Sequence, residues 1–145
     1  MATDSEELQQ VAAEAEDIAR SVNQPRSTAH LLLAIFTVPG PADELLRERG
    51  CSEDQVLDAL GAMGGAPEEA PEAWGTALQR ARQLADDCGQ AEAGSLHLLL
   101  ALTRLARTTA AALLERTAPP IATLRTAGLS QLTGALPRKR SKSVV

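Results

Sequence analysis

Aromatic and β-branched residues are scarce in this chain of 145 residues. It has no tyrosine, one phenylalanine and one tryptophan, and valine and isoleucine together number nine. Strands favour these residue types, so their scarcity argues against a protein built on sheets. The hydrophobic residues are mostly alanine (27) and leucine (22), which cost little free energy in a helix. The composition therefore predicts an all-α fold.

Lysine is almost missing as well. The chain has only Lys139 and Lys142, both within its last seven residues. A Walker phosphate loop needs a lysine directly after its glycines, where it reaches the terminal phosphates. The glycines within 61–65 are followed by alanine and proline instead. We therefore expect no ATP hydrolysis by this chain.

The net charge of −5 is unevenly distributed. Residues 1–72 carry −11, residues 73–137 carry +2, and the last eight residues, 138–145, carry +4. The field of an acidic first half repels nucleic acid and favours basic partners. The basic tail is predicted to be disordered, with contact to nucleic acid, an acidic partner or a membrane surface as the alternatives.

Cysteines and long apolar runs are also few. Cys51 and Cys88 lie 37 residues apart without metal-ligand spacing, which favours free thiols over a disulfide. The longest apolar run, 31–38, is far shorter than the roughly 20 residues that span a bilayer. The first seven residues are polar and acidic, unlike a targeting peptide. These features predict a cytoplasmic protein without membrane contact.

One sequence unit is present twice. The hexapeptide His-Leu-Leu-Leu-Ala-Ile at 30–35 recurs 67 residues later at 97–102, with a final leucine. Flanking segments repeat too, with an offset of 66 upstream and 68 downstream: 15–19 with 81–85, and 44–47 with 112–115. Offsets that drift only within loops are expected of a duplicated helical unit.

Apolar spacing, capping residues and helix breakers predict four helices in each unit. The first unit should have helices over 5–22, 29–37, 42–49 and 52–63. The second should have a helix ending at Gly89, one capped by Ser95, one over 109–117, and one opened by Pro119–Pro120 and ended by Gly128. The predicted organisation is one domain, 1–137, made of repeat one (5–63), a linker (64–71) and repeat two (72–130), followed by the tail 138–145.

The two motifs (Ser/Thr)-x-His-Leu-Leu-Leu-Ala-(Ile/Leu), with their flanking segments, resemble the Clp repeat N-terminal domain of AAA+ protein unfoldases such as ClpA, ClpB and ClpC. The resemblance covers residues 5–130. It implies eight helices as two tandem four-helix repeats with pseudo-two-fold symmetry. It also implies a non-catalytic module, expected to be monomeric, that binds Clp unfoldase or protease components, adaptors or substrate peptides. A fragment of a Clp unfoldase and a regulator that binds DNA through its tail remain alternatives.

The resemblance also places a ligand groove. In the ClpC branch, a glutamate before each histidine and a threonine at the start of each repeat form a pocket for phosphorylated arginine. Ala29 and Leu96 replace the glutamates, and Ser5 and Pro71 stand at the threonine positions. A guanidinium needs acceptors that alanine and leucine lack, so we expect phosphoarginine binding to be lost. The expected groove, which would prefer an apolar peptide or small hydrophobic molecule, consists of Asp4, Ser5, Ala29, Pro71, Trp74 and Leu96.

The two histidines, His30 and His97, begin the central helix of each repeat. We expect each ring to hydrogen-bond a neighbouring loop and to fix the helix start. Together with Cys51 and Cys88 they offer zinc-ligand types but no motif spacing. Neither cysteine has an obvious general base and orienting group. The sequence thus predicts no enzymatic activity, no metal and no cofactor.

Overall fold

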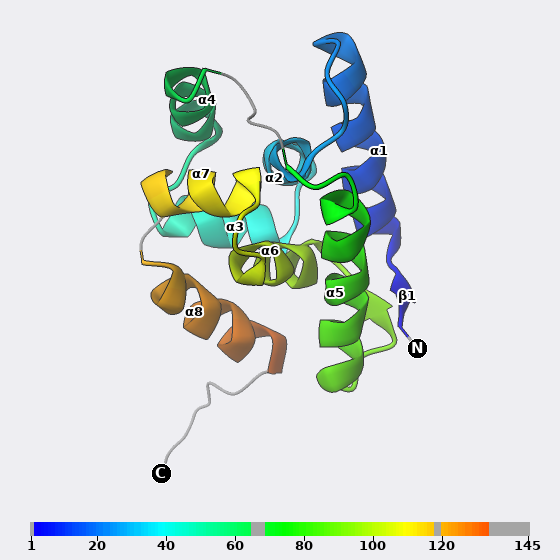
Figure 1. Cartoon of the computed structure of the whole chain (residues 1–145). Helices are drawn as coiled ribbons and strands as arrows, with labels where there is room; N and C mark the ends of the chain where they lie inside the picture. Colours follow the sequence, from blue (N-terminus) through cyan, green and yellow to red (C-terminus); the bar gives the residue numbers. More distant parts are fainter. Residues whose placement is uncertain (1, 65–68, 118–119, 134–145) are drawn as a thin grey trace.

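The computed structural model describes residues 2–64, 69–117 and 120–133. Within these ranges the chain forms eight helices and one small parallel sheet (Figure 1). The elements of the first half are β1 (Thr3–Asp4), α1 (Glu6–Ser21), α2 (Thr28–Thr37), α3 (Pro41–Glu48) and α4 (Glu53–Ala62). Those of the second half are α5 (Ala73–Asp87), β2 (Glu92–Ala93), α6 (Ser95–Arg104), α7 (Thr109–Thr117) and α8 (Ile121–Thr133).

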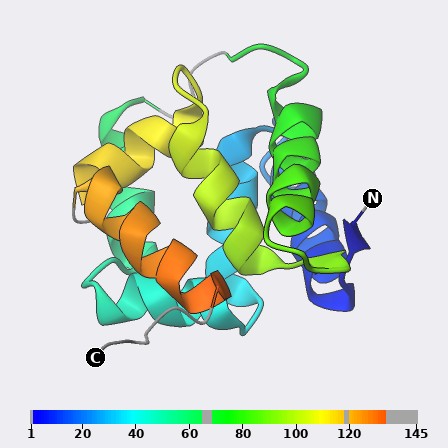
Figure 2. The same ribbon diagram turned by 90° about the horizontal axis from the view of Figure 1, so that it is seen from below.

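The repeated hexapeptides form α2 and α6, the two central helices. Every residue of α2 except Thr37 is buried, and every residue of α6 except Arg104. A helix that is apolar on all faces must be covered on all faces. The longer amphipathic helices α1 and α5 cover α2 and α6 respectively, while α3 and α7 each pack on both central helices. Figure 2 shows α6 between α5 and α8, with α2 behind it. One hydrophobic core therefore runs through both repeats.

Local signals set most of the helix ends. The Ser5 hydroxyl accepts a hydrogen bond from the backbone N–H of Leu8 at the start of α1. Ser52 and Gln55 form the capping box expected before α4. Gly89 follows α5 with a φ of 72°, a left-handed conformation that suits a helix C-terminus. Asn23 takes the same role after α1 with a φ of 57°.

The predicted N-cap of α6 is wrong. Gly94 is the N-cap of α6, and Ser95 is the first helical residue rather than the cap. The backbone N–H of Ser95 donates to a carboxylate oxygen of Glu7, 2.7 Å away. A side chain of α1 thus accepts a hydrogen bond at the start of α6, where the sequence predicted that Ser95 would cap the helix.

The predicted end of α8 is also wrong. The helix runs through Gly128 to Thr133 because this glycine lies against α6. A Cβ at Gly128 would stand 2.7 Å from a methyl carbon of Leu100, so the missing side chain permits close packing instead of ending the helix. Arg125 of α8 also contacts α6, because it donates to the backbone oxygen of Thr103 near the end of that helix (2.6 Å).

Sequence reasoning did not anticipate the sheet. Strand β1 lies parallel to β2, with Thr3 opposite Glu92 and Asp4 opposite Ala93.

No helix in the described ranges combines the length and hydropathy that crossing a bilayer requires. Residues 65–68 of the predicted linker, Pro119 of the predicted α8 start, and the tail 138–145 lie outside the described residues.

Candidate functional site

An open cavity of about 620 Å³ lies along the outer side of α5. Its lining comes almost entirely from the second repeat, between Pro71 and Gln83, and includes Trp74 and Arg82. Arg26, in the loop between α1 and α2, is its one contribution from the first repeat. Both halves of the chain therefore contribute residues to the lining of a ligand-sized cavity.

Trp74 and Arg26 form one end of the cavity. The Arg26 guanidinium carbon lies 4.9 Å from the centroid of the indole ring, a cation–π contact. A nitrogen of the same guanidinium donates to Glu16 on α1 at 3.0 Å. Trp74 is only 6% exposed, so most of its ring belongs to the core. Trp74 therefore packs in the core and also lines the cavity.

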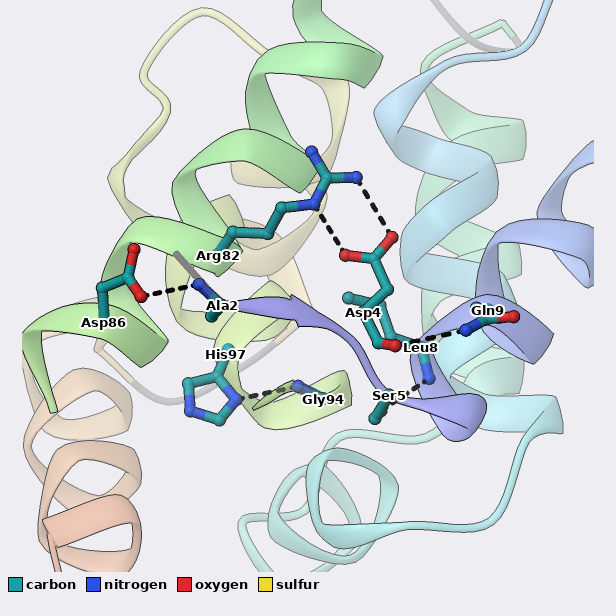
Figure 3. Close-up of polar contacts among 9 residues, drawn as sticks. All are labelled: Ala2, Asp4, Ser5, Leu8, Gln9, Arg82, Asp86, Gly94 and His97. Atoms are coloured by element: carbon teal, nitrogen blue, oxygen red, sulfur yellow. Dashed lines mark hydrogen bonds and ion pairs between the residues drawn. The ribbon is translucent and has the colours of Figure 1, made fainter. Parts of the chain in front are cut away.

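Arg82 lies two helical turns further along α5. Its Nε and Nη2 donate to the two carboxylate oxygens of Asp4, at 2.7 and 3.0 Å. This bidentate contact raises the pKa of Arg82 above its ordinary value. Figure 3 shows the guanidinium facing Asp4 with two nitrogens, while the third points away from that carboxylate.

The pairing of Asp4 with Arg82 is part of a larger attachment of the N-terminal segment. The backbone N–H of Ala2 donates to Asp86 on α5 at 2.7 Å, and that of Ser5 donates to the backbone oxygen of Ala93 at 2.8 Å. An extended segment that carries a carboxylate is therefore already held against α5 by this chain itself (Figure 3).

The six residues of the predicted groove are only partly brought together. Pro71 and Trp74 line the cavity, and Asp4 contacts it through Arg82. The hydroxyl of Ser5 is used to cap α1. Ala29 (0% exposed) and Leu96 (3%) are buried in the core. The apolar surface expected from these two side chains is therefore absent, because it is covered by packing between the repeats.

Two carboxylates that the sequence analysis did not single out occupy the starts of the central helices. Glu7 accepts from the N–H of Ser95 on α6, as described above. Glu69 accepts from the N–H and the hydroxyl of Thr28 on α2, at 2.7 and 2.8 Å, and from the N–H of Thr109 on α7 at 2.9 Å. Helix N-termini favour negative charge. Each central helix thus receives a carboxylate from outside its own repeat unit.

The two histidines also form hydrogen bonds at the starts of α2 and α6. Nδ1 of His30 accepts from the N–H of Ser27 at 3.0 Å, and Nδ1 of His97 accepts from that of Gly94 at 2.9 Å. Each Nε2 lies against a glutamine side-chain oxygen, from Gln24 and Gln90 respectively. Burial lowers the pKa of both rings, opposed to a smaller degree by Glu69 for the first histidine and Glu7 for the second. The predicted role in fixing helix starts is confirmed.

Cys51 lacks the surroundings of a nucleophile. Both cysteines are free, as predicted. The thiol of Cys51 is buried and donates to the hydroxyl of Thr117 at 3.6 Å, and burial raises its pKa. A raised thiol pKa suppresses the reactive thiolate. Within the described part of the chain, no three histidine, cysteine or carboxylate side chains are grouped so that they could hold a metal ion.

Arg26 and Arg82 are the site residues that sequence reasoning missed. Arg82 lies next to the apolar stripe of α5, and Arg26 lies in a loop between two helices. No periodicity or motif marks either residue. Their approach to one cavity depends on how α5 packs beside the loop 22–27.

The chain resembles solved structures in fold and little in sequence. No family model and no curated protein matches the sequence. The N-terminal domain of the caseinolytic protease associated chaperone ClpD from Arabidopsis thaliana matches with a TM-score of 0.71 and 16% identity, covering 89% of this chain and 96% of that chain. A structure from preliminary investigations of a malarial protein secretion system matches with a TM-score of 0.72 and 13% identity, covering 94% of this chain and 99% of the other.

Proposed function

We propose that this chain, which has the all-α, eight-helix fold of a Clp N-terminal domain, is a non-catalytic module that binds protein segments in the cytoplasm for a Clp protease or chaperone system. The observation that carries the proposal is the open cavity along α5 on a fold shared with a Clp-associated chaperone. Its partners would be Clp unfoldase or protease components, together with adaptor or substrate peptides.

The absence of catalysis is supported by how the reactive residue types are used. His30 and His97 direct Nδ1 at backbone N–H groups, so neither ring offers a free base at a cavity. Cys51 is buried with a raised pKa. A general base must reach the proton that it removes, and these contacts prevent it.

The preferred ligand differs from the one expected from the sequence. With Ala29 and Leu96 buried, the basis for an apolar preference is lost. The accessible donors are instead the guanidinium groups of Arg26 and Arg82 and the side chain of Gln79. The proposed groove is therefore the cavity along α5, with Asp4, Pro71 and Trp74 retained from the expected set.

The proposal is tested by adding the purified chain to a reconstituted Clp unfoldase and protease and following degradation of a fluorescent substrate. We expect the chain to bind the assembly and to change the degradation rate in a dose-dependent way. No binding to any Clp component, or ATP or peptide turnover by the isolated chain that a point substitution abolishes, would contradict it.

A further inference from the structure

We propose that the cavity along α5 recognises an acidic, extended peptide segment through Arg26 and Arg82. This inference rests on the proposed function as a peptide-binding module and names the class of ligand. The two arginines are the cationic side chains of the cavity lining, against one carboxylate, Glu72, at its rim. The ligand is a segment of a partner protein whose carboxylates meet the two guanidinium groups.

Both arginines keep donors for a ligand. Arg82 uses Nε and Nη2 on Asp4, and Arg26 uses Nη1 on Glu16. Their remaining nitrogens have no partner among the described residues, and each side chain is partly exposed, 35% and 56% respectively. The contact with Glu16 and the stacking on Trp74 hold the Arg26 guanidinium in place, which reduces the ordering cost when a ligand binds.

The chain itself shows the chemistry that the cavity would use. Strand β1 is extended, lies against β2, and places the carboxylate of Asp4 on Arg82 in a bidentate contact. A partner segment would present its carboxylates in the same way, sharing Arg82 with Asp4 and meeting Arg26 where it stacks on Trp74.

The helical rise between Trp74, which carries the stacked Arg26, and Arg82 gives the expected spacing of the acids. Arg26 lies over Trp74, and Arg82 is eight residues further along α5, about 12 Å along a helix axis. In an extended peptide, residues i and i+4 lie about 13 Å apart and point to the same side. We therefore expect two acidic residues separated by three others. The exposed Gln79 lies between Trp74 and Arg82 along α5 and can hydrogen-bond the peptide backbone.

The overall charge makes this recognition short-ranged. The chain has a net charge of −5, so its long-range field does not attract an acidic peptide. Selectivity must come from direct contact with the two guanidinium groups. A peptide with the same charge but the wrong spacing should therefore bind less well.

The test uses blocked heptapeptides and the fluorescence of Trp74, which is the only tryptophan, with calorimetry as a second measurement. The first peptide has glutamates at positions 2 and 6. The controls have glutamines at 2 and 6, glutamates at 2 and 3, or leucines at 2 and 6. We expect the first peptide to bind at least tenfold more tightly than the glutamine and leucine controls, and more tightly than the peptide with adjacent glutamates.

Three substitutions and a matched control assign the contacts. Arg26→Gln and Arg82→Gln should each weaken binding of the first peptide about tenfold, the loss expected for one charged hydrogen bond. Arg80→Gln, on the same helix but exposed and outside the cavity, removes the same charge and should change binding less than twofold. Asp4→Asn removes the competing carboxylate from Arg82 and should tighten binding. Thermal melts establish that each variant is folded.

The outcomes separate this inference from the proposed function. Equal binding of the glutamate and glutamine peptides, equal effects of Arg80→Gln and Arg82→Gln, or weaker binding by Asp4→Asn would overturn the acidic ligand class. If the leucine peptide binds instead, the peptide-binding function stands and only the ligand class is wrong. If no peptide binds and no Clp component binds, the proposed function itself fails.

Discussion

Lowering the pH from 7.5 to 5.5 should destabilise the fold through His30 and His97. Each ring accepts a backbone N–H at Nδ1, from Ser27 and from Gly94. Protonation places a hydrogen on Nδ1, so that two donors face each other and the capping contact is lost. Both rings are almost fully buried, 1% and 6% exposed, so solvent does little to relieve the charge. The N-termini of α2 and α6 lose support at the same time.

The direction and size of the effect follow from proton linkage. Burial lowers the pKa of both histidines in the folded state below the ordinary value of 6.5. The unfolded chain therefore binds more protons, and stability that is present above pH 6.5 is lost as the pH falls below it. One histidine contributes at most about 1.4 kcal/mol per pH unit, so the pair contributes at most about 2.7 kcal/mol over the one pH unit from 6.5 to 5.5. This is a large part of the 5–15 kcal/mol typical of a domain.

The measurement is the free energy of unfolding in urea at pH 7.5, 6.5, 6.0 and 5.5, followed by circular dichroism. The control variant replaces both histidines with glutamine, His30→Gln and His97→Gln. A glutamine can accept the same N–H without titrating, as Gln55 does for Ser52 at 3.0 Å. In this variant the free energy of unfolding should no longer fall as the pH is lowered below 6.5. A wild-type free energy that is flat over this range, or histidine midpoints at or above 6.5 by NMR, would refute the reasoning.

Two further predictions concern packing and capping. Gly128→Ala should destabilise the protein by about 1–3 kcal/mol because its Cβ would meet Leu100. Gly61→Ala, in α4 with open space around it, should be neutral or stabilising; equal thermal melts of the two variants would contradict this contrast. Glu69→Ala should destabilise by about 1–3 kcal/mol because the N–H at the start of α2 loses its acceptor. The exposed Glu72→Ala is its control, and a melting temperature unchanged in both variants would show that this cap is dispensable.

Features set by neighbours in the sequence were predictable. The apolar spacing of α1, the capping box at Ser52 and the breaker at Gly89 each depend on residues within one or two helical turns. The repeat itself indicated that α2 and α6 would be equivalent. The fold could be predicted because these local signals agree with one another in both halves.

Features set by distant contacts were not predictable. Glu7 and Ser95 are 88 residues apart, so spacing could not show that one caps the other. Gly128 looked like a helix end, and only its contact with α6 shows why the helix continues. Ala29 was expected at the surface through correspondence with a polar position, yet the packing of the repeats buries it. The candidate site depends on this kind of contact and was therefore predicted only in part.

The starts of the two central helices depend on carboxylates that lie outside their own repeats. Glu7 of repeat one accepts from the start of α6, and Glu69 of the linker, just ahead of α5, accepts from the start of α2. A cut through the linker that leaves Glu69 with the second repeat would therefore remove a carboxylate from both central helices. Separately expressed halves should then lose helix-start contacts as well as their shared core.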